Sequence, residues 1–226
     1  MPSVEVVRVD RSQLETLIGL HGNEDTPHVY VDGNVLVREL FWRRLEALLA
    51  LSQASPRGRV LDFGGGNGVL APTLSRLYAE AVCVDLRTEM AEALRQSEGL
   101  GNYTARAGEL RSPGLPDGHF DTIIAADVLE HVLDLEALVG ELHRLLVPGG
   151  ELLVSAPSEN RFYDLGRRVF GYTKPDDHFH PASYIEATVG QRLPMAQRRY
   201  FPFNVAPLAV FSLGRYVRSN RQEAAP

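Results

Sequence analysis

The chain has 226 residues, of which 44% are hydrophobic and 23% charged, which is ordinary for one globular domain with a full core. Its formal charge of -6 gives no reason to expect a general affinity for nucleic acid, and its single cysteine, Cys83, excludes an internal disulfide framework. The first residues lack the apolar stretch of a signal peptide, and no apolar run reaches the ~20 residues of a membrane span. We therefore expect a cytoplasmic protein with no transmembrane segment and a buried thiol.

Two helices are predicted ahead of the first strand. Ser12 and Glu15 match a capping box that opens a short helix, and residues 21–34 have the turn-forming composition of a loop. Apolar residues then recur at helical spacing over residues 35–51. We interpret residues 1–55 as a helical cap, which either lies over a ligand site as a lid or merely covers an edge of the sheet.

A strand, a glycine turn and a helix follow within residues 59–77. From Arg59 the chain reads RVLDFGGGNGVLAPT, with Asp62 near the end of the strand and four glycines in the turn. Glycine is needed where the backbone has a positive φ or where a ligand comes against it. An acid at the strand tip would repel a pyrophosphate, and it suits a ligand with a positive charge, such as an amino acid moiety. The alternative is an ordinary turn in which Asp62 caps the helix.

Strands and helices alternate through the rest of this region. Asp85 ends the second strand about twenty residues after the glycines, where an open α/β sheet presents a carboxylate to a ribose diol. The alternation predicts an α/β fold with a doubly wound, mostly parallel sheet. The strands are expected at 60–62, 80–85, 103–107, 120–126 and 151–156, and the helices at 69–77, 88–97 and 134–146.

The last seventy residues are less regular, and two closing strands bring the predicted sheet to seven. These strands should form an antiparallel hairpin at the sheet edge. The aromatic residues of this tail either fill the sheet core, wall an apolar acceptor pocket or form a homodimer face. The expected elements are a helix at 160–170, a loop at 171–181, a short helix opened by a capping box at Ser183 and Glu186, and strands at 198–203 and 208–217.

A series of segments in residues 59–157 resembles the class I S-adenosylmethionine-dependent methyltransferases, within them the type 11-like group that acts mostly on small molecules. This resemblance implies a Rossmann-like methyltransferase domain over residues 56–226. It also implies transfer of the methyl group of S-adenosylmethionine to an O, N or C nucleophile of a small-molecule acceptor. The matching segments are Val60–Gly68, Asp85, Gly108-Glu109, Pro116–Asp121, Val128–His131 and Leu146–Gly150.

The resemblance also implies roles for individual residues. The glycine backbone would lie against the methionine part of the cofactor with Asp62 near its ammonium, and Asp85 would hold the ribose hydroxyls. Asp127 would line the floor under the sulfonium, and Glu109, where the family usually has Asp, would reach the adenine amino group. Alternatively, Glu109 is solvated and Glu130 is a surface residue. The predicted cofactor-binding set is Asp62, Gly64, Gly66, Gly68, Asp85, Leu86, Glu109, Leu110 and Asp127.

Methyl transfer from a sulfonium mainly requires positioning of the nucleophile, and a base is needed only where the acceptor must lose a proton. The candidates for this base are His178 first and His131 second, because the reference pKa of histidine is near neutral. No cluster of Cys, His and carboxylates stands at metal-ligand spacing, and the pair His178 and His180 is too little for a site. We therefore predict no metal.

Two other functions stay open. The chain could be a scaffold or regulatory domain that binds S-adenosylmethionine without turnover. It could also be an NAD(P)-dependent oxidoreductase, because residues 66–71 satisfy the dinucleotide pattern G-x-G-x-x-A and Asp85 would serve a nicotinamide ribose equally well. Asp62, close to a bound pyrophosphate, argues against the second. An Asn-Pro-Pro-Tyr type segment is missing after the fourth strand, which disfavours a DNA or glutamine-type acceptor.

Overall fold

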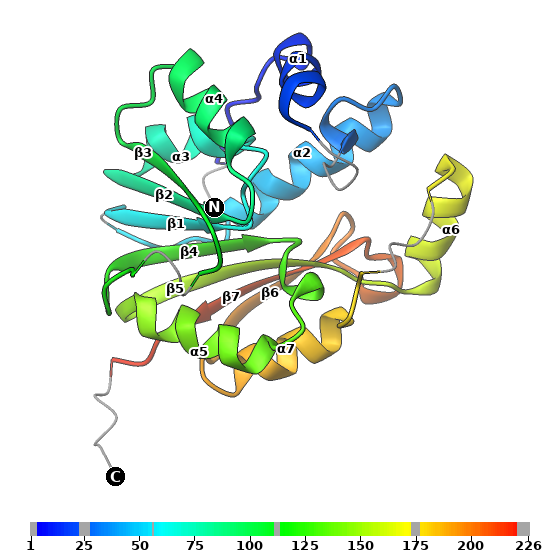
Figure 1. The fold of residues 1–226 in the computed structure, drawn as a ribbon. Helices are drawn as coiled ribbons and strands as arrows, with labels where there is room; N and C mark the ends of the chain where they lie inside the picture. The colour runs from blue at the N-terminus through cyan, green and yellow to red at the C-terminus, as the bar shows by residue number, and fades with distance from the viewer. Residues whose placement is uncertain (1–3, 23–27, 56, 111–113, 173–176, 221–226) are drawn as a thin grey trace.

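A seven-stranded sheet organises the part of the chain that the computed structural model describes, which is residues 4–22, 28–55, 57–110, 114–172 and 177–220 (Figure 1). The strand order is β3-β2-β1-β4-β5-β7-β6. The first five strands pair in parallel, whereas β7 runs antiparallel to both β5 and β6. This confirms the predicted doubly wound sheet with its antiparallel hairpin. The strands are β1 Arg59–Phe63, β2 Glu80–Asp85, β3 Tyr103–Ala107, β4 Phe120–Ala126, β5 Leu146–Pro157, β6 Met195–Phe201 and β7 Phe211–Val217.

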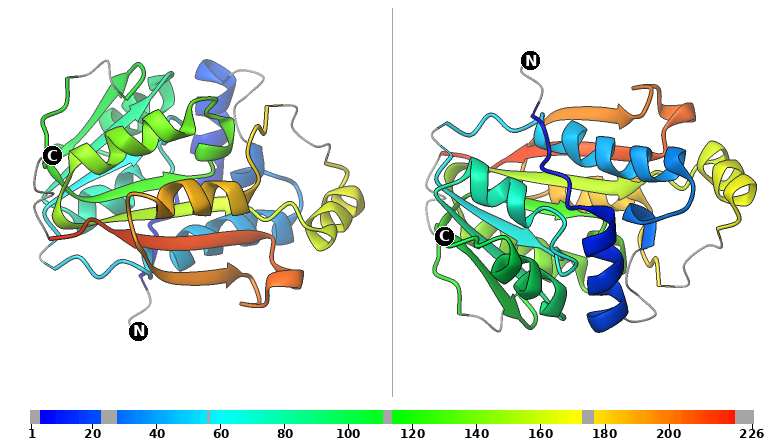
Figure 2. Two further views of the ribbon diagram at one scale, coloured as in Figure 1. Left: turned by 90° about the horizontal axis from the view of Figure 1, so that it is seen from below. Right: turned by 90° about the horizontal axis from the view of Figure 1, so that it is seen from above.

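Helices cover both faces of the sheet (Figures 1 and 2). One face carries α1 (Arg11–His21), α2 (Val35–Leu49), α3 (Ala71–Leu77) and α4 (Glu89–Ser97), and the other carries α5 (Leu135–Leu145) and α7 (Ala182–Gly190). Side chains alternate between the two cores along each strand, so that Val60 packs on the first and Leu61 on the second. None of the helices in the described ranges is long and apolar enough to span a bilayer.

One further helix, α6 (Arg161–Phe170), lies outside these layers. It projects beyond the sheet and buries none of its residues (Figure 1). Short 3-10 turns occur at His28–Tyr30 (η1), Leu129–His131 (η2) and Ala206–Leu208 (η3). The predicted loop at 171–181 falls partly outside the described residues, and its described part carries no regular element.

Both predicted capping boxes are wrong. Helix α1 begins after Asp10, whose carboxylate accepts hydrogen bonds from the N–H groups of Ser12 and Gln13. Helix α7 begins after Pro181 and has no side-chain cap, so that Ser183 lies inside the helix, and Glu186 pairs with Arg198 on β6. In the first case an acid two residues upstream takes the capping role, and in the second the helix begins before the predicted cap residue.

Strand boundaries also differ from the prediction near proline and glycine. β5 begins at Leu146, directly after α5, and Pro148-Gly149-Gly150 is accommodated by a shift of register between β4 and β5. β6 ends at Phe201 because Pro202 has no N–H for the ladder, and residues 206–208 form η3 rather than the start of β7.

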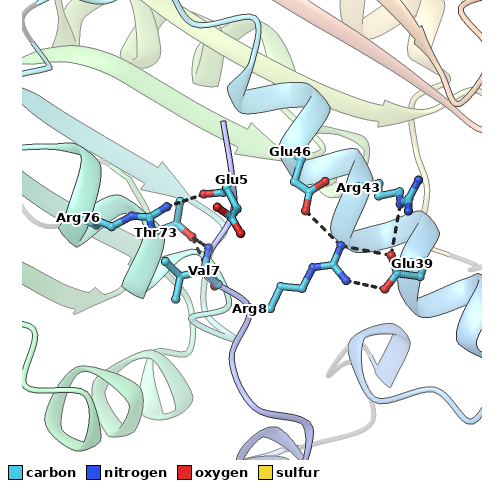
Figure 3. Close-up of polar contacts among 8 residues, drawn as sticks. All are labelled: Glu5, Val7, Arg8, Glu39, Arg43, Glu46, Thr73 and Arg76. Carbon is cyan, nitrogen blue, oxygen red and sulfur yellow. Dashed lines mark hydrogen bonds and ion pairs between the residues drawn. The ribbon is translucent and has the colours of Figure 1, made fainter. Parts of the chain in front are cut away.

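The segment ahead of α1 ties the N-terminal residues to the body of the molecule (Figure 3). Val7 N–H donates to Thr73 Oγ1 of α3 at 2.9 Å, and Arg8 pairs with Glu39 and Glu46 of α2. Buried residues from α1 and α2 belong to the same core cluster as those of β1 and β4. The N-terminal helices therefore share a core with the sheet, and the boundary between residues 55 and 56 stays a prediction.

Candidate functional site

Two adjoining cavities meet at Gly64, at the carboxyl ends of the parallel strands, which is where open α/β sheets bind ligands. The larger has a volume of about 640 Å³ and is lined by five predicted cofactor residues, namely Gly64, Asp85, Leu86, Glu109 and Leu110. The smaller, about 40 Å³, is lined by Asp62 and by Tyr30 and Arg44 from the N-terminal part. Six of the nine predicted cofactor residues thus line one or both of these cavities around the glycine turn.

Asp62 is a buried acid with unused hydrogen-bonding capacity. Its side chain is 2% exposed, and its Oδ2 has no hydrogen-bond partner among the described residues. Burial, and then the charge of Asp85, raise the pKa of the Asp62 carboxyl from 3.8 to about 7. Asp62 does not cap α3, because the N-terminus of that helix has no side-chain cap. Asp62 Oδ2 can therefore accept a hydrogen bond from a ligand that carries a donor or a positive charge.

The glycines of the turn leave room for the two acids. A Cβ on Gly65 would lie 2.1 Å from Asp62 Oδ2, and one on Gly66 would lie 2.6 Å from Asp85 Cγ. Gly68 has a φ of +71°, and a Cβ there would meet the backbone of α4. Gly66 and Gly68 line neither cavity. They act instead through backbone conformation and close packing.

Asp85 is fixed by backbone donors at the edge of the larger cavity. Gly66 N–H donates to its Oδ2 at 2.9 Å, and Arg87 N–H donates to its Oδ1 at 3.0 Å. Each carboxylate oxygen keeps a lone pair for a further donor. Glu109 is exposed and Leu86 is 72% exposed, whereas Leu110 is buried. The cavity therefore combines one oriented carboxylate with an apolar wall and an exposed rim.

Asp127 follows β4 with a φ of 54° and is held by two partners. Ser155 Oγ donates to its Oδ1 at 2.7 Å, and Arg44 Nη1 pairs with its Oδ2. Arg44 is 3% exposed and also donates to the hydroxyl oxygen of Tyr30 at 2.9 Å. Asp127 lines neither cavity, and its carboxylate anchors α2 to the end of β4.

Arg44 and Tyr30 are site residues that the sequence analysis missed. Tyr30 fell in a segment interpreted as a loop. Arg44 falls on the apolar stripe of its helix, three residues after Phe41 and four before Leu48, and its guanidinium lies 5.1 Å from the Phe41 ring centroid. An arginine at helical spacing within an apolar stripe was the available signal, because such a residue is buried only with a partner.

The two predicted histidines come together although they lie far apart in the sequence. The ring centroids of His131 and His178 are 4.8 Å apart in an edge-to-face arrangement. His131 lines the larger cavity, whereas His178 lines neither. Glu130, beside them, is 1% exposed, so the interpretation as a surface residue is wrong. These three residues form a polar cluster next to the larger cavity, which we call the histidine cluster.

Comparison with known proteins defines the family. The sequence model of a family described as "Methyltransferase domain" matches residues 37–192. The chain therefore belongs to this methyltransferase family, which confirms the class I S-adenosylmethionine-dependent methyltransferases as its class. This membership is at odds with the oxidoreductase alternative.

Individual relatives extend the comparison. The ubiquinone/menaquinone biosynthesis C-methyltransferase UbiE of Shewanella sp. (strain ANA-3) is 34% identical over 137 residues, which cover 58% of this chain and 53% of the relative. The chain thus spans about half the length of the curated relatives it matches. The N-methyltransferase NodS of Bradyrhizobium japonicum WM9, solved with S-adenosyl-L-homocysteine, has a TM-score of 0.65 at 19% identity, covering 91% of this chain and 98% of NodS.

A further solved structure has the same fold and is named for a different activity. The [4+2]-cyclase SpnF has a TM-score of 0.66 at 14% identity, covering 97% of this chain and 99% of SpnF. At such identities these structures establish the fold alone. The reaction must therefore be argued from the site of this chain.

Proposed function

We propose that the chain binds S-adenosylmethionine at the two cavities and transfers its methyl group to a small-molecule acceptor. The observation that carries the proposal is the buried carboxylate of Asp62, whose Oδ2 has no partner among the described residues. An ammonium beside it would restore the lost hydrogen bonding and return the carboxyl to its ionised form. Family membership over residues 37–192 supports the same reaction class.

The larger cavity fits the adenosine part of this cofactor. Both Asp85 oxygens already accept backbone donors, which orients the carboxylate toward two neighbouring ribose hydroxyls. Leu110 supplies apolar wall for an adenine ring, and the exposed Glu109 reaches the rim where the exocyclic amino group would lie. Leu86 would cover the outer face of the ring.

The smaller cavity implies movement of the N-terminal part. A volume of about 40 Å³ holds a few water molecules and is too small for an amino acid moiety. Tyr30 and Arg44 form its outer wall and both belong to the segment before residue 55. Binding of the methionine part would displace them, which is the behaviour expected of the lid predicted for residues 1–55.

When bound, S-adenosylmethionine supplies an activated methyl group, and the chain then has to position the acceptor and exclude water. Apolar side chains from the residues on either side of η2, from α5 and from the segment before α7 wall the larger cavity next to Gly64, among them Val128, Leu133 and Phe179. Where the acceptor must lose a proton, His131 is better placed than His178 because it lines this cavity. The same wall favours a small apolar acceptor over a nucleic acid.

A scaffold or regulatory domain that binds S-adenosylmethionine without turnover is the second candidate. The fold does not decide between this candidate and the methyltransferase, since the [4+2]-cyclase SpnF has the same fold. We also propose the cytoplasm as the location, which the single buried cysteine supports. We likewise retain the proposal that the C-terminal hairpin forms the contact of a homodimer.

Calorimetric titration with S-adenosylmethionine and S-adenosylhomocysteine tests the proposal. We expect micromolar binding that Asp85→Ala weakens by about 1–3 kcal/mol, the usual loss for hydrogen bonds to a charged group. Glu80→Ala, an exposed acid at the opposite end of the same strand, is the matched control and should leave affinity unchanged. No binding of either ligand, or binding of NAD in their place, would overturn the proposal. Binding without turnover in an acceptor screen would favour the scaffold.

A further inference from the structure

The histidine cluster has the composition of a metal site. Glu130, His131 and His178 each offer one ligand atom, and these atoms all lie within 4.8 Å of one another. Two of the residues come from η2, and the third comes from the segment before α7. A hydrogen bond from Phe179 N–H to the backbone oxygen of Glu130, 2.8 Å long, joins the two segments. This backbone hydrogen bond therefore holds the segment with His178 next to the segment with Glu130 and His131.

The carboxylate of Glu130 points to a cation as the missing partner. Its side chain is 1% exposed, and Oε2 is buried without a hydrogen-bond partner among the described residues. A buried carboxylate is costly unless it is paired with a positive charge or protonated. One nitrogen of each imidazole lies within 4.8 Å of a Glu130 carboxylate oxygen, and two imidazoles with one carboxylate are a common set of metal ligands.

The imidazole of His178 is backed by a second carboxylate, because its Nδ1 forms a hydrogen bond of 2.8 Å with Glu159 Oε1. His131 Nδ1 lies 2.8 Å from Oδ2 of the exposed Asp177, but the two atoms do not have hydrogen-bonding geometry. A carboxylate next to Nδ1 favours the proton on that nitrogen and leaves Nε2 as the free electron-pair donor. Histidine ligands of metals almost always have such a partner, which orients the ring and raises its basicity. His178 and Glu159 are both largely buried, so this contact is shielded from solvent.

We infer that Glu130, His131 and His178 bind a divalent transition metal ion of the Zn²⁺ type. Two nitrogen ligands and one carboxylate oxygen suit Zn²⁺, Fe²⁺ or Mn²⁺ better than Mg²⁺ or Ca²⁺, which prefer oxygen alone. Bonds of about 2.0–2.1 Å in a tetrahedral site place ligand atoms roughly 3.3 Å apart. The three groups would therefore close by about 1.5 Å at most, which side-chain rotation can supply.

Three protein ligands leave a coordination position open, as in catalytic rather than structural sites. Because His131 also lines the larger cavity, that position would face the space proposed for the acceptor. This consequence rests on the proposed function. It would favour an acceptor that offers an oxygen ligand, and it would make the two histidines ligands rather than the general base.

Titration of the untagged, EDTA-treated full chain with Zn²⁺ tests the inference by calorimetry, and titration with Co²⁺ gives a second readout by visible absorption. We expect one ion per chain with micromolar or tighter affinity, and a visible Co²⁺ spectrum typical of nitrogen and oxygen ligands. His178→Ala, His131→Ala and Glu130→Gln should each weaken binding at least tenfold. Glu159→Gln should weaken it by about tenfold through loss of the orienting carboxylate.

His119→Ala is the matched control, because His119 lies just before β4 at the opposite edge of the sheet, and it should bind as the wild type does. S-adenosylmethionine titrations of every variant in EDTA check folding and test the proposed function separately. Stoichiometric binding that is insensitive to the cluster substitutions, or no binding of Zn²⁺ and Co²⁺ by wild type, would overturn the metal site. Preference for Mg²⁺ over both ions would overturn the transition-metal assignment.

Discussion

Replacing Asp62 with asparagine separates the cost of a buried charge from its use in binding. The substitution keeps the size and shape of the side chain and removes its charge. In the free protein the pKa of Asp62 is raised from 3.8 to about 7, because burial and the charge of Asp85 both disfavour the ionised form. The unfolded chain titrates near 3.8, so ionisation lowers the stability of the wild type as the pH rises from about 4 to about 7.

The magnitude follows from the two pKa values. A rise from 3.8 to about 7 corresponds to roughly 4 kcal/mol of unfolding free energy, which is lost in full above pH 7. At pH 5 the wild type has already lost part of this unfolding free energy. The stability of Asp62→Asn relative to wild type should therefore grow by roughly 2.5 kcal/mol between pH 5 and pH 8. At pH 8 the same variant should bind S-adenosylmethionine about 10- to 100-fold more weakly, because the ammonium loses its carboxylate.

Urea unfolding without ligand at both pH values measures the first effect, and calorimetry at pH 8 measures the second. Glu80→Gln, which changes an exposed acid of β2, is the matched control and should leave ligand affinity unchanged. The reasoning is refuted if Asp62→Asn changes stability equally at both pH values and also leaves ligand affinity unchanged. A gain in stability together with weaker binding is the signature of a carboxylate held for a cationic ligand.

Two substitutions, each with a matched control on a helix, test the surroundings of this carboxylate. Gly65→Ala should weaken S-adenosylmethionine binding at least tenfold, because its Cβ would lie 2.1 Å from an Asp62 oxygen. Gly19→Ala, with open space at its Cβ on α1, should instead stabilise the protein by up to about 1 kcal/mol. Arg44→Met should cost about 2–4 kcal/mol in urea unfolding, since it leaves a partly buried Asp127 without its cation. Arg43→Met on the exposed face of the same helix should cost less than about 1 kcal/mol, and equal losses would contradict a buried anchor.

Local patterns predicted elements well where packing and propensity agreed. Val60 and Leu61 lie in opposite cores as expected for a strand buried on both faces, and Asp62 and Asp85 stand at the strand ends. The patterns failed at the first and last residues of helices and strands. Glu186 was assigned to a capping box and is engaged by Arg198 from another strand, a partner that local spacing does not reveal.

The amino-acid sequence by itself determined the sheet, the glycine turn and the family, because these depend on periodicity and on residues that are neighbours in the chain. Tertiary structure alone decided which distant groups meet. Arg44 becomes a partner of Asp127 because α2 packs against the end of β4, and His178 reaches His131 because a backbone hydrogen bond joins their segments. The ionisation of Asp62 was likewise decided by burial, since the pKa of a carboxyl depends on the solvent and charges around it rather than on its neighbours in sequence.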